Sequence, residues 1–218
     1  MIDIRDTALI NSFPVQAVPK YGAFQPLTCN GQRLLIAGNG FFLDLYRDWL
    51  YAIQVCAQRD GAIRYPFGEM ASQLSLRISD QIASLVDEFF GLARGTLPNE
   101  CAAAGIYDHN TRQCTLKVCE AVSASPTALT YRPPLLGPTE SIAIDIHSHG
   151  TLPAVFSAQD DQDDVAAIKL AMCVGHIDRP VPTVSARLCL NGLFVPLYTH
   201  SYGMWWLDEH GSSVKLHS

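Results

Sequence analysis

The chain has 218 residues, 48% hydrophobic and 17% charged, with a formal net charge of −6. A chain of this length holds one large domain or a domain with a small extension, and its composition excludes an intrinsically disordered protein. Nucleic-acid-binding surfaces usually carry a stripe of Lys and Arg, and the sequence has no basic run. We therefore expect no nucleic-acid partner.

Cysteine usage and hydropathy indicate the cellular compartment in which the protein is expected. The odd number of cysteines and the absence of a Cys-x-x-Cys pair argue against a disulfide framework and favour a reducing cytoplasm. The N-terminal stretch lacks the apolar core of a signal peptide, and no apolar stretch reaches membrane length. We expect a cytoplasmic protein without a membrane partner, whose cysteines are Cys29, Cys56, Cys101, Cys114, Cys119, Cys173 and Cys189.

Residues 1–75 are expected to form a small β-rich N-terminal extension. Residues 1–30 are rich in Pro, Gly and polar residues and predict an extended arm. Asn39-Gly40 between apolar runs is a hairpin signal. The segment Phe41–Val55 fits a helix face or a strand face, and its aromatic enrichment favours strands.

Residues 76–218 are expected to form one larger domain in which strands alternate with two helices. In chain order we expect a helix from Ser79 that stops at Gly95, strands at Ala102–Tyr107 and Thr115–Val122, a loop at Pro126–Pro138, a strand at Ile142–His149, a long helix at Ala158–Met172, and a hairpin of Val184–Leu190 with Leu193–Leu197. This pattern predicts a mixed α/β layered fold.

The stretch from Ile142 to Asp164 carries a metal-binding pattern. Its first half alternates with period two, which places His147 and His149 on one face of a strand. Two neutral imidazoles at positions i and i+2 can share one metal ion. Catalytic zinc takes three protein ligands and leaves one position for water, so Asp160 is the expected third ligand.

A purely structural interpretation accounts for part of this pattern. Ser157 followed by Asp160 is close to a capping box at the start of a helix. Capping does not account for two histidines at the end of an apolar strand. The two interpretations are compatible, since a carboxylate at a helix start can cap the helix and bind a metal together.

These residues resemble a known signature. His147-Ser148-His149, Ser157 and Asp160 are similar to the motif of the JAMM/MPN+ zinc metalloproteases, and the surrounding text DIHSHG…PAVFSAQDDQDD resembles the plasmid-associated bacterial branch called PRTRC system protein A. The resemblance covers about residues 78–198 and implies the layered, cytidine-deaminase-like JAMM/MPN fold. One departure is Gly150, where many eukaryotic members have Pro.

Amide hydrolysis also needs a base and an oxyanion donor. The resemblance places the base at Glu100, in the sequence Pro98-Asn99-Glu100, with Glu120 as the alternative. Ser157 is the candidate oxyanion donor because its hydroxyl lies near the third ligand. Asp145 shares the histidine face of its strand, and either orients an imidazole or faces solvent.

Three classes of function remain open. The resemblance implies a zinc peptidase or isopeptidase that cleaves after the tail of a ubiquitin-like protein, with an E1-like, ThiF-family adenylating partner. A sulfur-carrier-processing protease is a second enzyme hypothesis. A non-catalytic MPN-type scaffold is the third, although scaffolds of this fold have lost ligands that this chain retains. The acidic balance counts against a DNA-repair-type relative.

Overall fold

A computed structural model describes residues 3–58, 65–200, 203–207 and 213–215. The chain divides between Arg77 and Ile78 into two compact units, close to the boundary expected at residue 75. We describe each unit by itself. Within the described ranges, no helix has both the length and the apolar character needed to cross a membrane.

The first unit is built on a five-stranded sheet with the order β1-β2-β3-β4-β5. Strands occupy the ambiguous stretch Phe41–Val55, as its aromatic residues favour. The expectation of an extended arm over residues 1–30 is wrong, because the chain there forms a helix and a strand that pairs parallel with β2. The elements are α1 (Ile4–Ser12), β1 (Val15–Ala17), β2 (Gly31–Ala37), β3 (Gly40–Arg47), β4 (Leu50–Gln58) and β5 (Gln73–Leu76).

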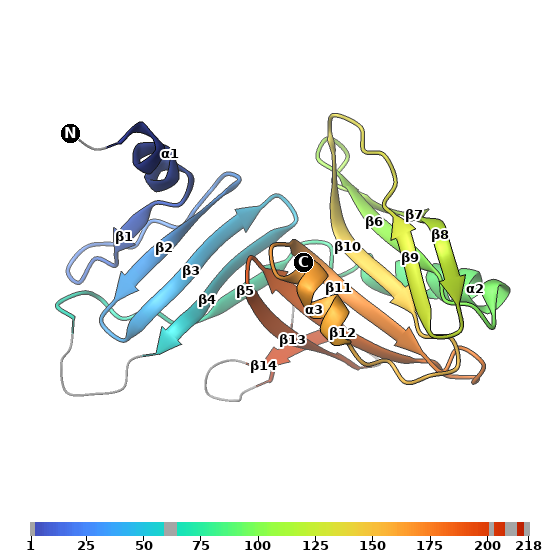
Figure 1. Cartoon of the computed structure of the whole chain (residues 1–218). Helices are drawn as coiled ribbons and strands as arrows, with labels where there is room; N and C mark the ends of the chain where they lie inside the picture. Colours follow the sequence, from blue (N-terminus) through green and yellow to red (C-terminus); the bar gives the residue numbers. More distant parts are fainter. Residues whose placement is uncertain (1–2, 59–64, 201–202, 208–212, 216–218) are drawn as a thin grey trace. The chain divides into compact units, whose positions relative to one another are not determined.

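The second unit is built on an eight-stranded sheet with the order β15-β14-β13-β12-β11-β10-β6-β7 (Figure 1). Among the described strands, β10 and β11 pair in parallel and their other neighbours pair antiparallel. The elements are α2 (Ile82–Thr96), β6 (Ala102–Asp108), β7 (Cys114–Val118), β8 (Glu120–Ser125), β9 (Ala128–Arg132), β10 (Glu140–Ser148), α3 (Ala158–Asp164), β11 (Ile168–Gly175), β12 (Thr183–Leu190), β13 (Leu193–His200), β14 (Gly203–Leu207) and β15 (Ser213–Lys215).

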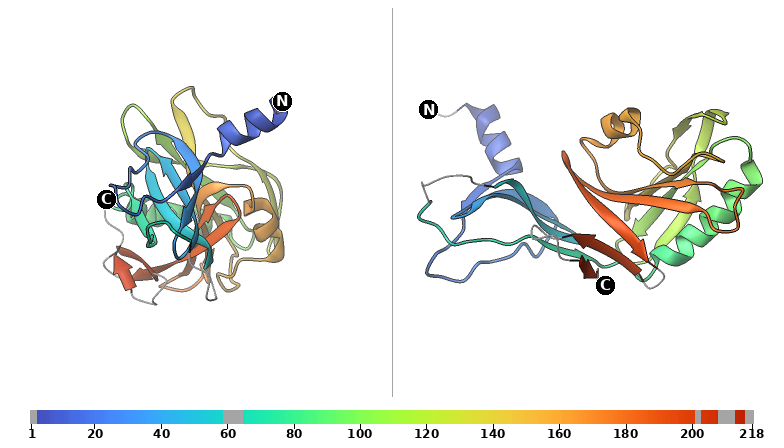
Figure 2. Two further views of the ribbon diagram at one scale, coloured as in Figure 1. Left: turned by 90° about the vertical axis from the view of Figure 1, so that its left-hand side faces the viewer. Right: turned by 90° about the horizontal axis from the view of Figure 1, so that it is seen from below.

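The two helices lie on opposite faces of this sheet, as the right-hand view of Figure 2 shows. Helix α2 buries a stripe at helical spacing, formed by Ile82, Leu85, Phe89 and Ala93, as the sequence predicts. On the face of α3, β8 and β9 form a separate two-stranded sheet. The unit is therefore a mixed α/β structure with few helices, in agreement with the coarse fold expectation.

Three local expectations are wrong. The single strand expected over Thr115–Val122 is divided at Cys119 into β7 of the eight-stranded sheet and β8 of the two-stranded sheet. The long helix expected over Ala158–Met172 ends at Asp164, and Ile168–Gly175 forms strand β11. Six of its eight residues are buried, so this apolar run is an interior strand of a parallel pair, which period alone does not separate from a buried helix. The loop expected over Pro126–Pro138 contains β9, which pairs with β8.

Strand β10 sorts its side chains between the two faces of the sheet. Ile144, Ile146 and Ser148 are buried, whereas Asp145 and His147 are partly exposed on the other face. The register with β6 shifts between Ile142 and Ile144, so the predicted alternation breaks at this irregularity. From Ile144 onward the alternation is regular and delivers His147 to the face that carries α3.

Candidate metal centre

The two histidines of the motif meet at the end of β10. The Nε2 atoms of His147 and His149 are 3.1 Å apart. The Nδ1 atom of His149 lies 3.1 Å from the carbonyl oxygen of Pro153. An N–H at Nδ1 would donate to that oxygen and leave the Nε2 lone pair free, which is the tautomer that a metal ligand needs. Burial lowers the pKa of His147 and so favours its neutral, ligating form.

The loop after His149 has a backbone that Pro cannot adopt. Gly150 has φ of +52°, in the left-handed region, whereas the Pro ring fixes φ near −65°. A Cβ at Gly150 would also lie 3.2 Å from the carbonyl oxygen of Pro98. Proline at position 150 would therefore require a different loop, and the loop observed here runs close to the segment that carries Glu100.

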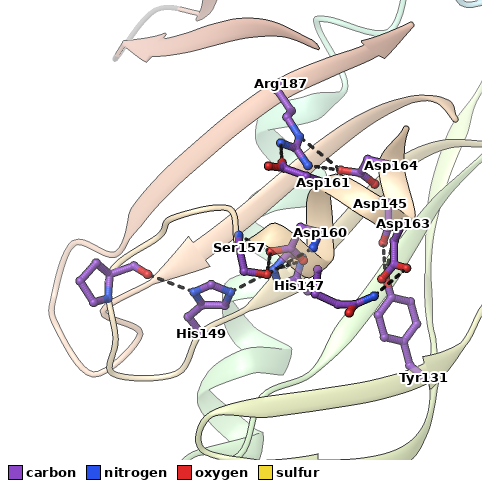
Figure 3. Close-up of polar contacts among 12 residues, drawn as sticks. Tyr131, Asp145, His147, His149, Ser157, Asp160, Asp161, Asp163, Asp164 and Arg187 are labelled. Atoms are coloured by element: carbon purple, nitrogen blue, oxygen red, sulfur yellow. Dashed lines mark hydrogen bonds and ion pairs between the residues drawn. The ribbon is translucent and has the colours of Figure 1, made fainter. Parts of the chain in front are cut away.

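The start of α3 forms a capping box, as the structural interpretation of the sequence predicts. The Ser157 hydroxyl accepts a hydrogen bond from the Asp160 backbone N–H, and the Ser157 backbone N–H donates to Asp160 Oδ2. The Ser157 hydroxyl also donates to Asp160 Oδ2 at 2.7 Å. Burial alone would raise the pKa of Asp160, but the hydrogen bonds from Ser157 hold it below its ordinary value. Asp160 Oδ1 lies 3.6 Å from His147 Nε2, so the capping carboxylate also faces the histidines (Figure 3).

Ion pairs, not apolar packing, dock α3 on the sheet. The helix has the sequence AQDDQDD, and Asp164 is its buried residue. Arg187 in β12 binds Asp164 Oδ2 through Nη2 at 2.6 Å, and its Nη1 contacts Asp161. The Arg187 guanidinium also lies between the rings of Phe156 and Phe194, with Cζ 4.0 and 4.2 Å from their centroids.

A lysine extends this network to the histidine strand. Lys169 Nζ in β11 lies 2.7 Å from Asp164 Oδ1 and 2.5 Å from Asp145 Oδ2. Asp145 also accepts a hydrogen bond from the Tyr131 hydroxyl at 2.9 Å. Asp145 therefore has β9 and β11 as its partners, and its expected role in orienting an imidazole stays a prediction. Through Lys169, the network joins α3 to β10.

Glu100 lies at the start of β6, beside the histidines. Its backbone N–H donates to the Ser125 carbonyl at the end of β8. The backbone N–H of the next residue, Cys101, donates to Ser148 Oγ in β10. The segment is thus held between the β8–β9 hairpin and the histidine strand. Burial raises the pKa of the Glu100 carboxyl, which is 8% exposed, and the charge of nearby Asp160 adds to the rise while His149 opposes it.

One cavity of about 330 Å³ joins these groups. Glu100, His147, His149, Ser157 and Asp160 all line it, so the structure brings together every residue of the predicted metal and catalytic set. The alternative base, Glu120, lies on the exposed face of β8, 71% exposed, within 3.7 Å of Arg132.

Sequence reasoning missed one donor in this region. Cys173 in β11 pairs in register with His147 and is fully buried, and its Sγ lies within 4.8 Å of ring nitrogens of both histidines. Its distance in sequence from the motif and the false helix expected over Ala158–Met172 concealed it. All seven cysteines are free thiols.

The donor set fits a zinc ion. Two ring nitrogens face each other, and a carboxylate and a thiol lie beside them; nitrogen, sulfur and carboxylate oxygen are the ligands of zinc in proteins. The other histidines stand elsewhere: His109 stacks edge-on with Tyr107, His176 Nδ1 lies 3.0 Å from the Thr151 carbonyl, and His200 lies in β13. His210 and His217 fall outside the described residues.

Comparison with known families assigns a domain type to each unit. Residues 3–77 match a domain of unknown function, DUF2016, and residues 83–189 match the model of prokaryotic homologs of the JAB domain. The second unit thus contains a JAB-like domain, which agrees with the JAMM/MPN resemblance at the level of the domain. No curated protein matched the chain. A solved structure that resembles it is the solution structure of protein DSY2949 from Desulfitobacterium hafniense, with 14% identity, 62% of this chain and 88% of that chain covered, and a TM-score of 0.38.

Proposed function

We propose that the JAB-like domain is a zinc-dependent peptidase or isopeptidase. The observation that carries this proposal is the single cavity that holds two histidines, a capping carboxylate and a second, buried carboxylate. JAB domains include both hydrolases and non-catalytic members, and a scaffold has no need of a base beside its ligands. Glu100 favours the hydrolase.

Each residue has a separate task in this proposal. His147, His149 and Asp160 would hold the metal, which supplies a Lewis acid that acidifies water and polarises a carbonyl. Glu100 accepts a proton from the attacking water and passes it to the leaving amine. The raised pKa that burial gives Glu100 suits this exchange, since a base works best when its pKa approaches the operating pH.

Ser157 would donate to the oxyanion. In the present structure its hydroxyl donates to Asp160, so this role requires the hydroxyl to turn towards the substrate. The Ser157 backbone N–H bonds the same carboxylate oxygen of Asp160 and would hold the carboxylate while the hydroxyl turns. The capping box is thus compatible with catalysis.

The proposed substrate is the C-terminal tail of a ubiquitin-like or sulfur-carrier-like protein. The hairpin β8–β9 is its proposed docking strand, because Ala128, Leu129 and Tyr131 of β9 line the cavity and the hairpin forms a two-stranded sheet of its own. An extended tail that pairs with this hairpin would be read through its main chain, and small residues would let it approach the metal. We also propose that the protein is a cytoplasmic enzyme of a PRTRC-type bacterial system. Its fold would have the cytidine-deaminase-like layering, and its partner would be an E1-like protein of the ThiF family.

The test is Glu100→Gln, which removes proton transfer and keeps all three proposed ligands. We expect one zinc per chain in both the wild type and the variant by elemental analysis. Cleavage of fusions to ubiquitin-like proteins, followed by mass, should fall by a factor of about 100 to 10,000 in the variant. Glu120→Gln, on the exposed face of β8, is the matched control and should cleave normally.

Two outcomes would contradict the proposal. If the wild type binds zinc and cleaves none of the fusions, the domain is a scaffold. If Glu100→Gln cleaves normally while Glu120→Gln does not, the base has been assigned to the wrong carboxylate.

A further inference from the structure

The side chain of Cys173 is fully buried beside the two histidines, and the peptidase scheme gives it no task. Strands β10 and β11 run parallel with Cys173 opposite His147, so both side chains leave the same face of the sheet. The Sγ atom and ring nitrogens of His147 and His149 all lie within 4.8 Å of one another. Among the described residues, these three donors form the group whose atoms lie within that distance of one another; Asp160 is not one of them, although its Oδ1 lies 3.6 Å from His147 Nε2.

We propose that Cys173 binds the metal directly as a thiolate. Zinc bonds nitrogen at about 2.0–2.1 Å and sulfur at about 2.3 Å, so tetrahedral coordination places a ligating nitrogen and a ligating sulfur about 3.6 Å apart. The three donor atoms lie within 4.8 Å of one another, so metal binding would bring the sulfur up to about 1.2 Å closer to the ring nitrogens through side-chain movement. With Asp160, the centre then has four protein donors.

Burial raises the pKa of the Cys173 thiol to about 12, and the nearby carboxylates of Asp160 and Glu100 add to the rise, so the metal-free protein holds a thiol and a bound cation would have to stabilise the thiolate. The backbone N–H of Val155 donates to Cys173, and Val155 belongs to the loop that joins His149 to Asp160. Hydrogen bonds from backbone N–H groups to ligating sulfur are a usual means of tuning metal–thiolate centres. On metal binding, the S–H bond breaks, a sulfur lone pair forms the bond to the metal, and the proton passes to solvent.

This assignment has two consequences. A thiolate beside two imidazoles favours zinc, cobalt and cadmium over hard ions such as magnesium. Four protein donors also fill a tetrahedral zinc, whereas a catalytic zinc keeps one position for water. In the proposed peptidase, water would therefore have to replace one of these donors before hydrolysis, and a thiolate-bound form would be the resting form. The existence of a resting form rests on the proposed function, whereas the assignment of Cys173 as a metal donor does not.

Cobalt(II) spectroscopy tests the assignment without any substrate. The metal-free full-length chain is titrated with cobalt(II), because a cobalt–thiolate bond gives an intense charge-transfer band in the near ultraviolet. We expect the wild type to show this band at one cobalt per chain, and His147→Ala to lose it. Cys173→Ser should bind cobalt without the band.

Cys114→Ser is the matched control. Cys114 is a buried thiol in β7, and its register partner is Tyr107, so this variant should keep the band. If Cys173→Ser fails to fold, sulfur scattering in the X-ray absorption spectrum of the cobalt-loaded wild type decides the question.

The outcomes separate this inference from the proposed function. A wild type that binds cobalt without the band or sulfur scattering overturns the assignment of Cys173 and leaves the peptidase proposal intact. A band that persists in Cys173→Ser also overturns the assignment. A wild type that shows the band and cleaves no substrate supports the assignment and contradicts the proposed function. A wild type that binds neither cobalt nor zinc overturns both.

Discussion

Replacing Arg187 by Met should weaken metal binding at a site that Arg187 does not touch. Arg187 and Asp164 are 9% and 6% exposed, and removing one partner of a buried pair costs about 3–5 kcal/mol. Lys169 still binds Asp164 in the variant, which places the cost near the lower limit. The Asp161 side chain is 53% exposed, so water replaces the hydrogen bond that it loses. The loss of this second ion pair therefore adds little to the cost in stability. We expect a loss of about 3 kcal/mol.

This free energy stabilises the docked position of α3, the helix that carries Asp160. Because the helix has no apolar face, metal binding in the variant must also restore its position. Since about 1.4 kcal/mol corresponds to a factor of ten, about 3 kcal/mol would lower zinc affinity by up to about 100-fold. Met keeps apolar contact with the rings of Phe156 and Phe194, so the comparison isolates the charge.

Zinc affinity is measured by competition with a chromophoric chelator, and stability by urea denaturation with and without zinc. Arg132→Met is the control, because Arg132 and its partner Glu120 are 69% and 71% exposed and contribute about 0–1 kcal/mol. Equal zinc affinities in Arg187→Met and Arg132→Met would refute the docking of α3 by this network.

Three further outcomes follow from the structure. Burial raises the pKa of Glu100 in the folded state above its ordinary 4.5, so ionising this carboxyl costs stability. The metal-free wild type should match Glu100→Gln in urea denaturation below pH 4.5, lose stability relative to it as pH rises from 4.5 to the raised pKa, and stay the less stable protein above that pKa. Equal stabilities at every pH would contradict this. A Cβ at Gly175 would lie 2.3 Å from the Ala154 nitrogen, so Gly175→Ala should destabilise the domain by about 1–3 kcal/mol in thermal unfolding. Gly91 in helix α2 has open space around its Cβ position, so Gly91→Ala should stabilise the domain by up to about 1 kcal/mol in the same assay. Enlarging the glycines of a substrate tail should slow cleavage more than changing the leaving group, and the reverse result in a fusion series would rule out docking along β8–β9.

The motif itself was predictable because its information is local. Period two identifies the strand before His149, and the spacing from Ser157 to Asp160 identifies a capping box; both patterns fix which side chains share a face or a helix start. The structure contains both elements. The hairpin of β12 and β13 around Asn191-Gly192 was predictable for the same reason.

The errors arise where distant contacts decide the structure. The run after Asp164 is apolar except for Lys169, and only its place between β10 and β12 makes it a strand. That error concealed the pairing of Cys173 with His147. Arg187 escaped notice because its partners, Asp161 and Asp164, lie in helix α3, far from it in the sequence, and no local pattern marks it. The acidic run Asp160–Asp164 suits a solvated helix start, yet its last residue is 4% exposed.

The proposed metal donors all come from one β–α–β segment of the chain. His147 and His149 lie at the end of β10, Asp160 in the crossover helix, and Cys173 in the parallel strand β11 that the crossover reaches. An ion held by them would act as a cross-link that closes the crossover loop and restricts the unfolded chain, as a disulfide does. Glu100 enters from β6, outside that segment. Metal retention and hydrolysis are therefore expected to be separable properties, because mutation of Glu100 would abolish the proposed activity without removing a proposed metal ligand.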